Sequence, residues 1–341
     1  MTNRISSVLP TPISATAQTL GQFKRSFSVL CVAAGLACLS AQAMAADPVR
    51  LVVPFTAGGP ADMIARKLAE KLGPELSATI VVENRPGANG AVGVNAVTRA
   101  EGDGSVVLFA TSGMLTISPV LYKNLPFDPL RDLKPMASAV VNGSVLLVNA
   151  KLPVNDIPSF AAYANSQPNP VPIGSAGQGN ITHLYMEMLK ANGKMALTHI
   201  PYKGVASALA DVIGGQIAGV FVDLPAALPQ MEGGRVKALG LVGTERHASA
   251  PDIKTIEEQG VKGVDSLSWF GFMGPAALTD EAAQRFYQAL QKVLADPALV
   301  ADLKSIGSVP YLKGPEEMRA QILQDQKRWE EVIRTQNIVV D

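Results

Sequence analysis

The chain has 341 residues, of which 48% are hydrophobic and 17% charged, a composition that builds a packed core and excludes a disordered protein. Its 29 basic and 29 acidic residues cancel, and only 5% of the residues are aromatic, so neither bulk charge nor stacking surfaces favour a nucleic-acid partner. The length is sufficient for two domains of ordinary size.

The first 45 residues have the pattern of an export signal. They contain three basic residues and no acidic one, followed by an apolar run over residues 27–39. Ala43-Met44-Ala45 is a small-residue cleavage pattern, so we expect cleavage between Ala45 and Ala46. The apolar run is too short to span a membrane, which favours a cleaved signal over an anchor.

Cleavage at this point would remove the chain's cysteines, because Cys31 and Cys38 both lie in the leader. The mature chain would then have no disulfide and no reactive thiol. The three basic residues of the leader would also be lost, which leaves 26 basic and 29 acidic residues and a net charge of 26 − 29 = −3. We therefore expect a soluble, exported protein.

The mature chain opens with an apolar strand over residues 47–54, a glycine-rich loop and a helix. Apolar residues recur at helical spacing between Ala61 and Leu72. Pro60 suits the first helical position, and Asp62 suits the first turn. Backbone N–H groups at such a helix start favour an anion, and ligands bind at the carboxyl ends of parallel strands. The alternative is an ordinary turn between strand and helix, and the loop is neither a Walker loop nor a G-x-G-x-x-G motif.

Strands and helices continue to alternate, which predicts a largely parallel sheet. Residues 118–134 contain three prolines and are expected to be a loop. The buried strand that precedes them ends in Thr111-Ser112-Gly113, a further loop of small residues. The expected strands are 79–83, 105–110 and 140–149, and the expected helices are 91–99 and 153–164.

A second glycine-rich loop, Ser175-Ala176-Gly177-Gln178-Gly179-Asn180, follows a short strand over residues 171–174. Asn180 is a good N-cap for the amphipathic helix that begins at Ile181. Small residues let backbone N–H groups approach a carboxylate, and each charge-assisted bond contributes about 1.5–3 kcal/mol. Two such loops could hold one carboxylate between them. The alternative is again an ordinary turn.

The pattern then repeats before the chain returns along an apolar strand over residues 266–275. Two crossings between two α/β units predict two lobes, a cleft and a hinge, an arrangement that favours closure on a small ligand. The expected lobes are residues 46–147 with 268–341, and residues 148–267. The remaining expected strands are 196–200, 217–222 and 236–242, and the remaining expected helices begin at 205, 225, 279 and 315.

Few side chains suggest chemistry. The mature chain has three histidines, His183, His199 and His247, and none has the spacing of a metal ligand, so no metal or other cofactor is expected. Ser175 with His183 could form a hydrolase pair, although Gly174-Ser175-Ala176-Gly177 is not a nucleophile elbow. The competing interpretation places His183 as a packed or hydrogen-bonded side chain at the start of a helix.

Asp223 ends a strand and could accept hydrogen bonds from a ligand amine or hydroxyl. It could equally be the N-cap of the helix that begins near Pro225. Tyr202-Lys203-Gly204 has the composition of a simple turn. Trp269 and Phe270, on the return strand, could pack in the hinge or line the cleft, and packing is the favoured interpretation.

Several spaced motifs in order resemble the Bug, or TctC, family, the periplasmic solute-binding proteins of tripartite tricarboxylate transporters. They are PFTAGGPAD, ENRPGANG, LFATSGMLTISP, SAGQGNITHL, HIPYKG, GGQ…DLPAALP and SWFG. The resemblance covers nearly all of residues 48–338. It implies a two-lobed periplasmic-binding-protein-like α/β fold of type II that captures carboxylic acids, partly through bound water.

The resemblance also implies a site and a role. The protein would be a non-enzymatic periplasmic monomer that closes on a small carboxylate, dicarboxylic and aromatic acids included, and delivers it to membrane permease subunits. The alternatives are an exported serine hydrolase and a ligand sensor that contacts a receptor kinase. The implied ligand-binding residues are Phe55, Thr56, Ala57, Gly58, Gly59, Ser112, Gly113, Ser175, Ala176, Gly177, Gly179, Asn180 and Asp223.

The chain departs from the family pattern at the expected cleft. Thr56-Ala57 stands where the family usually has two prolines or Pro-Ala, Ala61 where threonine is usual, and Asn180 where serine or threonine is common. The identity of the acid therefore transfers least well from the family to this chain.

Overall fold

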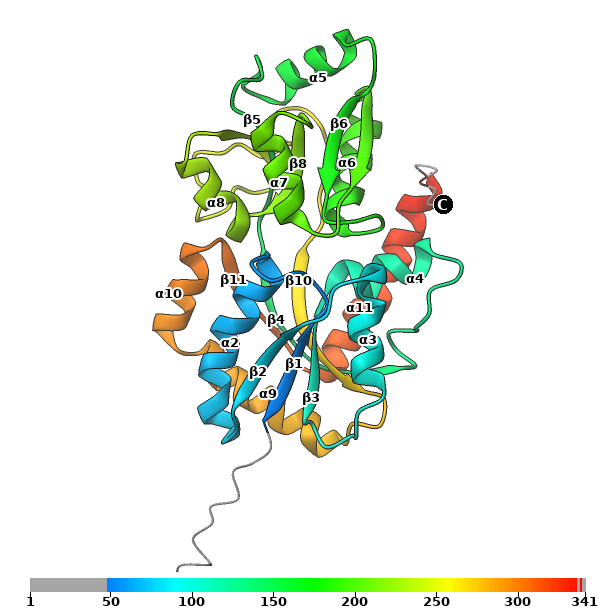
Figure 1. Cartoon of the computed structure of the whole chain (residues 1–341), viewed down its shortest axis with the longest axis vertical. Helices are drawn as coiled ribbons and strands as arrows, with labels where there is room; N and C mark the ends of the chain where they lie inside the picture. Colours follow the sequence, from blue (N-terminus) through cyan, green and yellow to red (C-terminus); the bar gives the residue numbers. More distant parts are fainter. Residues whose placement is uncertain (1–47, 336–337, 339–341) are drawn as a thin grey trace, which may run out of the picture. The chain divides into compact units, whose positions relative to one another are not determined.

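The computed structural model describes residues 48–335 and residue 338, and the expected export signal over residues 1–45 lies outside the described residues. The described strands form two sheets, one of six strands and one of five, each flanked by helices (Figure 1). The predicted fold class, two mixed sheets joined by two crossings, is confirmed.

The first sheet has the strand order β11-β4-β10-β3-β1-β2. Strand β1 pairs in parallel with β2 and β3, whereas β10 runs antiparallel to both β3 and β4. Helices α2 and α9 share one hydrophobic cluster with this sheet, and α3 and α11 share another (Figure 1). The strands are β1 (Val49–Val53), β2 (Ile80–Asn84), β3 (Val106–Thr111), β4 (Leu133–Asn142), β10 (Ser268–Pro275) and β11 (Ser308–Lys313). The helices are α2 (Pro60–Leu76), α3 (Ala91–Thr98), α9 (Asp280–Leu294) and α11 (Pro315–Thr335).

The second sheet has the order β7-β6-β8-β5-β9. Strand β6 pairs in parallel with β7 and β8, and β5 runs antiparallel to β8 and β9. Helices α5 and α6 contribute to one hydrophobic cluster, and α7 and α8 to the other. The strands are β5 (Ser144–Asn149), β6 (Val171–Ser175), β7 (Leu197–Pro201), β8 (Gly219–Asp223) and β9 (Val236–Leu241). The helices are α5 (Ile157–Ser166), α6 (Ile181–Asn192), α7 (Val205–Gly214) and α8 (Leu224–Glu232).

The strand expected over residues 140–149 is the first crossing between the sheets. Strand β4 ends at Asn142 in the first sheet, and β5 begins at Ser144 in the second. Gly143 separates them at a crowded point, because a Cβ there would lie 2.6 Å from Leu224 Cδ1 and 2.9 Å from the His247 ring. A side chain would have to displace both neighbours, so the chain changes sheets at a glycine.

Helix α11 packs beside both sheets. Met318 and Ile322 belong to a cluster of the first sheet, whereas Trp329 belongs to a cluster of the second. The helix predicted to begin at residue 315 is confirmed, and these three side chains are all buried.

The chain also forms elements that the sequence pattern did not indicate. Helix α4 (Ser118–Leu121) lies within the stretch expected to be a loop, after a π-helical turn, η2 (Gly113–Ile117). A short 3-10 turn, η1 (Ala88–Gly90), precedes α3, and α10 (Pro297–Ser305) leads into β11. These are short segments, in which helical periodicity has too few turns to appear.

Candidate functional site

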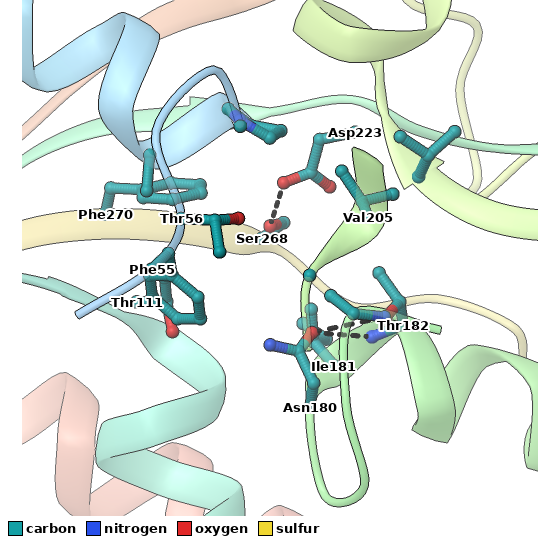
Figure 2. A pocket seen from close by; sticks show the side chains of 16 residues that line it. Phe55, Thr56, Thr111, Asn180, Ile181, Thr182, Val205, Asp223, Ser268 and Phe270 are labelled. Carbon is teal, nitrogen blue, oxygen red and sulfur yellow. Dashed lines mark hydrogen bonds between the residues drawn. The ribbon is translucent and has the colours of Figure 1, made fainter. Parts of the chain in front are cut away.

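A pocket lies between the two sheets and is lined by loops from both (Figure 2). We call it the inner pocket, and its volume is about 60 Å³. The side of the first sheet contributes Phe55, Thr56, Gly59, Pro60, Ala61, Thr111, Ser268 and Phe270. The side of the second sheet contributes Ala176, Asn180, Ile181, Thr182, Gly204, Val205, Val222 and Asp223.

The first glycine-rich loop is held from beneath by Asp62. The Gly58 N–H donates to Asp62 Oδ2 over 2.9 Å, and Asn84 Nδ2 donates to Asp62 Oδ1 over 3.0 Å. Burial opposes ionisation of Asp62, but hydrogen bonds from Arg66, Gly58 and Asn84 outweigh it and lower the pKa. The Gly58 N–H is therefore already bonded to a carboxylate. Ala57 and Gly58 are exposed and do not line the inner pocket, whereas Thr56 directs its hydroxyl toward it (Figure 2).

The second glycine-rich loop uses most of its backbone donors internally. The N–H of Ala176 donates to Thr182 Oγ1 over 3.0 Å, and that of Gly177 donates to Ser175 Oγ over 3.1 Å. The N–H of Gly179 donates to His183 Nδ1 over 3.1 Å. The sequence pattern predicted that these N–H groups would bind a carboxylate. They instead bond within the loop and fix its shape.

Asn180 leaves one polar group for the pocket. It is the predicted N-cap of α6, and its Oδ1 accepts from the Thr182 N–H over 3.2 Å. The side-chain amide nitrogen points away from that helix, toward the side where Phe55 lies (Figure 2). Asn180 therefore both starts the helix and presents a donor to the space between the sheets.

A stacked histidine pair lies beneath this loop. Ser175 Oγ lies 2.6 Å from Nε2 of His199, not of His183, and the rings of His183 and His199 stack with centroids 3.7 Å apart. Because His183 Nδ1 accepts the Gly179 N–H, its ring proton lies on Nε2, which faces Glu187 Oε1 at 3.7 Å. The predicted hydrogen-bonded role of His183 is confirmed. Ser175 is fully buried, and its partner is His199, so the Ser175–His183 hydrolase pair does not form.

Asp223 lines the inner pocket and is held by three side chains. Its carboxylate accepts from Ser144 Oγ over 2.5 Å, from Ser268 Oγ over 3.0 Å and from Asn142 Nδ2 over 3.3 Å. It is the N-cap residue of α8, as one of the two interpretations predicted, but its side chain makes no capping hydrogen bond. Burial raises the pKa of Asp223, although the three hydrogen bonds oppose this effect.

The partners of Asp223 come from the two crossings between the sheets. Asn142 and Ser144 flank the first crossing at Gly143, and Ser268 begins β10, the strand by which the chain returns. A group that contacts Asp223 would therefore act on both connections at once.

The sequence pattern missed a third loop of the pocket, the one before α7. Gly204 and Val205 line the inner pocket although Tyr202-Lys203-Gly204 was expected to be a simple turn. Gly204 has φ +151°, and a Cβ there would lie 2.8 Å from Thr56 Oγ1, so this loop touches the first glycine-rich loop. The sequence signal that could have identified this loop is a strand that ends just before a glycine and a helix.

The return strand contributes one packed and one lining aromatic residue. Trp269 is buried and donates from Nε1 to Asp325 Oδ2 over 2.9 Å, as a packing role predicts. Phe270 also packs in the core and in addition lines the inner pocket, so both interpretations hold for this residue. Ser112 and Gly113 are buried outside the pocket, and Gly113 lies against the start of α6.

The residues that the structure describes include no group of three or more His, Cys, Asp or Glu side chains that could hold a metal ion. In the same part of the chain, no helix is both long and apolar enough to cross a membrane.

Two mixed sheets, two crossings and a pocket between the sheets define a protein of the periplasmic-binding-protein type. Three solved structures are similar to this chain. The periplasmic binding protein BugD is 32% identical, with a TM-score of 0.81, over 86% of this chain and 98% of that one. R. palustris Rpa4515 with adipate is 29% identical, with a TM-score of 0.83, over 86% of this chain and 98% of that one. MatC from Rhodopseudomonas palustris with bound malate is 26% identical, with a TM-score of 0.79, over 84% of this chain and 98% of that one.

The sequence profile of the TctC family, described as "Tripartite tricarboxylate transporter family receptor", matches residues 64–338. The chain belongs to this family, as its spaced motifs predicted. The family consists of periplasmic binding proteins, which are non-enzymatic components of transport.

Proposed function

We propose that this protein captures a small carboxylate between its two sheets, closes around it, and delivers it to the membrane subunits of a tripartite tricarboxylate-type transporter. One observation carries the proposal. Among the described helices, α2, α6 and α7 all begin at the inner pocket, through Gly59, Asn180 and Val205. Each helix start carries a partial positive charge, so the convergence of three helix starts favours an anion.

The proposed site keeps six of the residues expected from the sequence and adds two. Thr56 and Asn180 would donate to the carboxylate, and Asp223 would accept from an amine or hydroxyl elsewhere on the ligand. Of the other expected residues, Gly177 and Gly179 line an adjoining, larger pocket, and the rest would support the loops from outside. The proposed lining is Phe55, Thr56, Gly59, Ala176, Asn180, Gly204, Val205 and Asp223.

Two structural relatives support an acid as the ligand, because Rpa4515 was solved with adipate and MatC with malate. We further propose that the two sheets are the cores of two lobes, residues 46–142 with 268–341 and residues 144–267. This division takes the first boundary at Gly143, where the chain changes sheets. Export would follow cleavage before Ala46, which mass spectrometry of the secreted chain would test.

The first test is a thermal-shift screen of residues 46–341 against mono-, di- and tricarboxylates, aromatic acids and acidic amino acids. The protein is first unfolded and refolded to remove any bound ligand. A ligand present at a thousand times its Kd should stabilise the fold by about 4 kcal/mol, which raises the Tm by several degrees.

The amide of each acid that binds is the matched control, because it keeps the size of the ligand and removes its charge. We expect the acid to bind and the amide to fail. The absence of a shift with every acid, or equal shifts with acid and amide, would contradict the proposed function.

A further inference from the structure

A second and larger pocket opens next to the inner one. We call it the outer pocket, and its volume is about 650 Å³. Phe55, Thr56, Ala176 and Asn180 line both pockets, so the two spaces adjoin at the proposed carboxylate donors. A ligand held at Thr56 and Asn180 would therefore extend into the outer pocket unless it were very short.

The charged side chains of the two pockets differ in sign. Among the described residues, the inner pocket is lined by one charged side chain, Asp223. The outer pocket is likewise lined by one charged described side chain, Lys203. Lys203 is exposed and makes no ion pair or hydrogen bond with any side chain in the described part of the chain. The nearby Arg85 is already bonded to Glu83 over 2.7 Å.

The backbone on either side of Lys203 is firmly held. The Tyr202 N–H donates to the Ser175 carbonyl oxygen over 3.2 Å, and the Tyr202 hydroxyl donates to Asp211 Oδ2 over 2.6 Å. Burial and the Asp211 carboxylate raise the pKa of Tyr202 to about 12, so the hydroxyl remains a donor at neutral pH. On the other side, Gly204 lies against Thr56. The lysine is thus fixed at the rim by its neighbours, and its side chain is free to reach a ligand.

We propose that Lys203 is a specificity-determining residue that binds a second acidic group of the ligand in the outer pocket, while the first carboxylate lies at the helix starts of the inner pocket. This inference rests on the proposed function and narrows it to dianionic acids. A lysine side chain suits this role because its flexible aliphatic chain and three N–H donors accommodate acids of different length. A monocarboxylate would leave Lys203 without a partner.

The test compares adipate with its mono-amide, which has the same length and one carboxylate fewer, by calorimetric titration of residues 46–341. The variant is Lys203→Gln, and the control is Lys262→Gln, because Lys262 is also exposed and lines neither pocket. A charge-assisted hydrogen bond predicts that Lys203→Gln weakens adipate binding about tenfold or more and changes mono-amide binding less than twofold. Lys262→Gln should change neither affinity.

The two ligands and two proteins form a double-mutant cycle, so a general loss of folding or of loop shape would weaken both ligands equally. Equal loss for adipate and mono-amide, or equal affinity of the wild type for both, would overturn the role of Lys203 and leave the proposed carboxylate function intact. If neither adipate nor its mono-amide binds and the acid screen also fails, both the role of Lys203 and the proposed carboxylate function would be overturned. Failure of adipate and of malate to bind, when the screen finds a monocarboxylate that does bind, would likewise overturn the role of Lys203.

Discussion

Asn180 combines two tasks that a single substitution can separate. Its Oδ1 caps α6 through the Thr182 N–H, while its amide nitrogen points toward the side of Phe55 (Figure 2). Aspartate caps a helix as well as asparagine does, but it would bring a negative charge to the proposed carboxylate site. Capping and ligand binding therefore respond differently to the change.

We expect Asn180→Asp to weaken the binding of the acid found in the screen about a hundredfold, because a donor to a charged group is lost and a like charge is added. The free energy of unfolding should change by less than about 0.5 kcal/mol, since the cap is preserved. Titration calorimetry and urea unfolding measure the two quantities. Undiminished affinity would place the carboxylate away from α6.

The position of Asp223 was predictable from the sequence, whereas its hydrogen bonds were not. Its position at the end of a strand, next to a pocket, was predictable from the alternation of strands and helices. Its hydrogen bonds to Ser144 and Ser268 were not, because the three residues are far apart in the chain and meet only when the two crossings lie side by side. Its N-cap position also followed from local rules, but its carboxylate bonds to residues of the two crossings instead of capping the helix.

At the scale of elements, the two glycine-rich loops were predictable because each is a local strand–loop–helix pattern. The third loop was not, because Gly204 reaches the pocket only through its packing on Thr56. The hydrogen bonds within the second loop could not be predicted either, because they depend on where the first turn of α6 places Thr182 and His183. The break at Gly143 had a signal, a single glycine within an apolar run, which often marks an irregularity in a strand.

The second loop rests on a histidine pair contributed by α6 and β7, which makes its stability depend on pH. Burial, with His183 beside it, lowers the pKa of His199 to about 3. The folded state therefore binds this proton less readily than the unfolded chain does. The stabilising contribution is fully present above about pH 6.5, the ordinary histidine pKa, and is lost as the pH falls toward 3.

We expect the Tm of the wild type to fall between pH 6.5 and pH 4 more steeply than that of His199→Gln, whose side chain does not titrate. A difference of several degrees is the expected size, because about 1 kcal/mol corresponds to 2–4 °C in a domain of this size. Thermal unfolding followed by circular dichroism at a series of pH values provides the comparison. Parallel pH profiles of the two proteins would contradict a role for His199 in acid sensitivity.

At the scale of the whole chain, the two crossings join the sheets and also carry the partners of Asp223. Ser144 follows Gly143 at the first crossing, and Ser268 begins the second. The family's closure on a ligand, which we propose for this chain, would bend these connections. The packing of Gly143 against Leu224 and His247 fixes the point at which the first connection passes between the sheets.

Gly143→Ala tests this crossing. The added Cβ would lie 2.6 Å from Leu224 Cδ1 and 2.9 Å from the His247 ring, so both side chains must move, and we expect a loss of about 1–3 kcal/mol in the free energy of unfolding. Gly214→Ala is the matched control, because it adds the same methyl group at the end of α7, with no atom within 4 Å. Alanine there should be neutral or should stabilise by up to about 1 kcal/mol. Urea unfolding of both variants measures the difference, and equal stabilities would show that the crossing tolerates a side chain at residue 143.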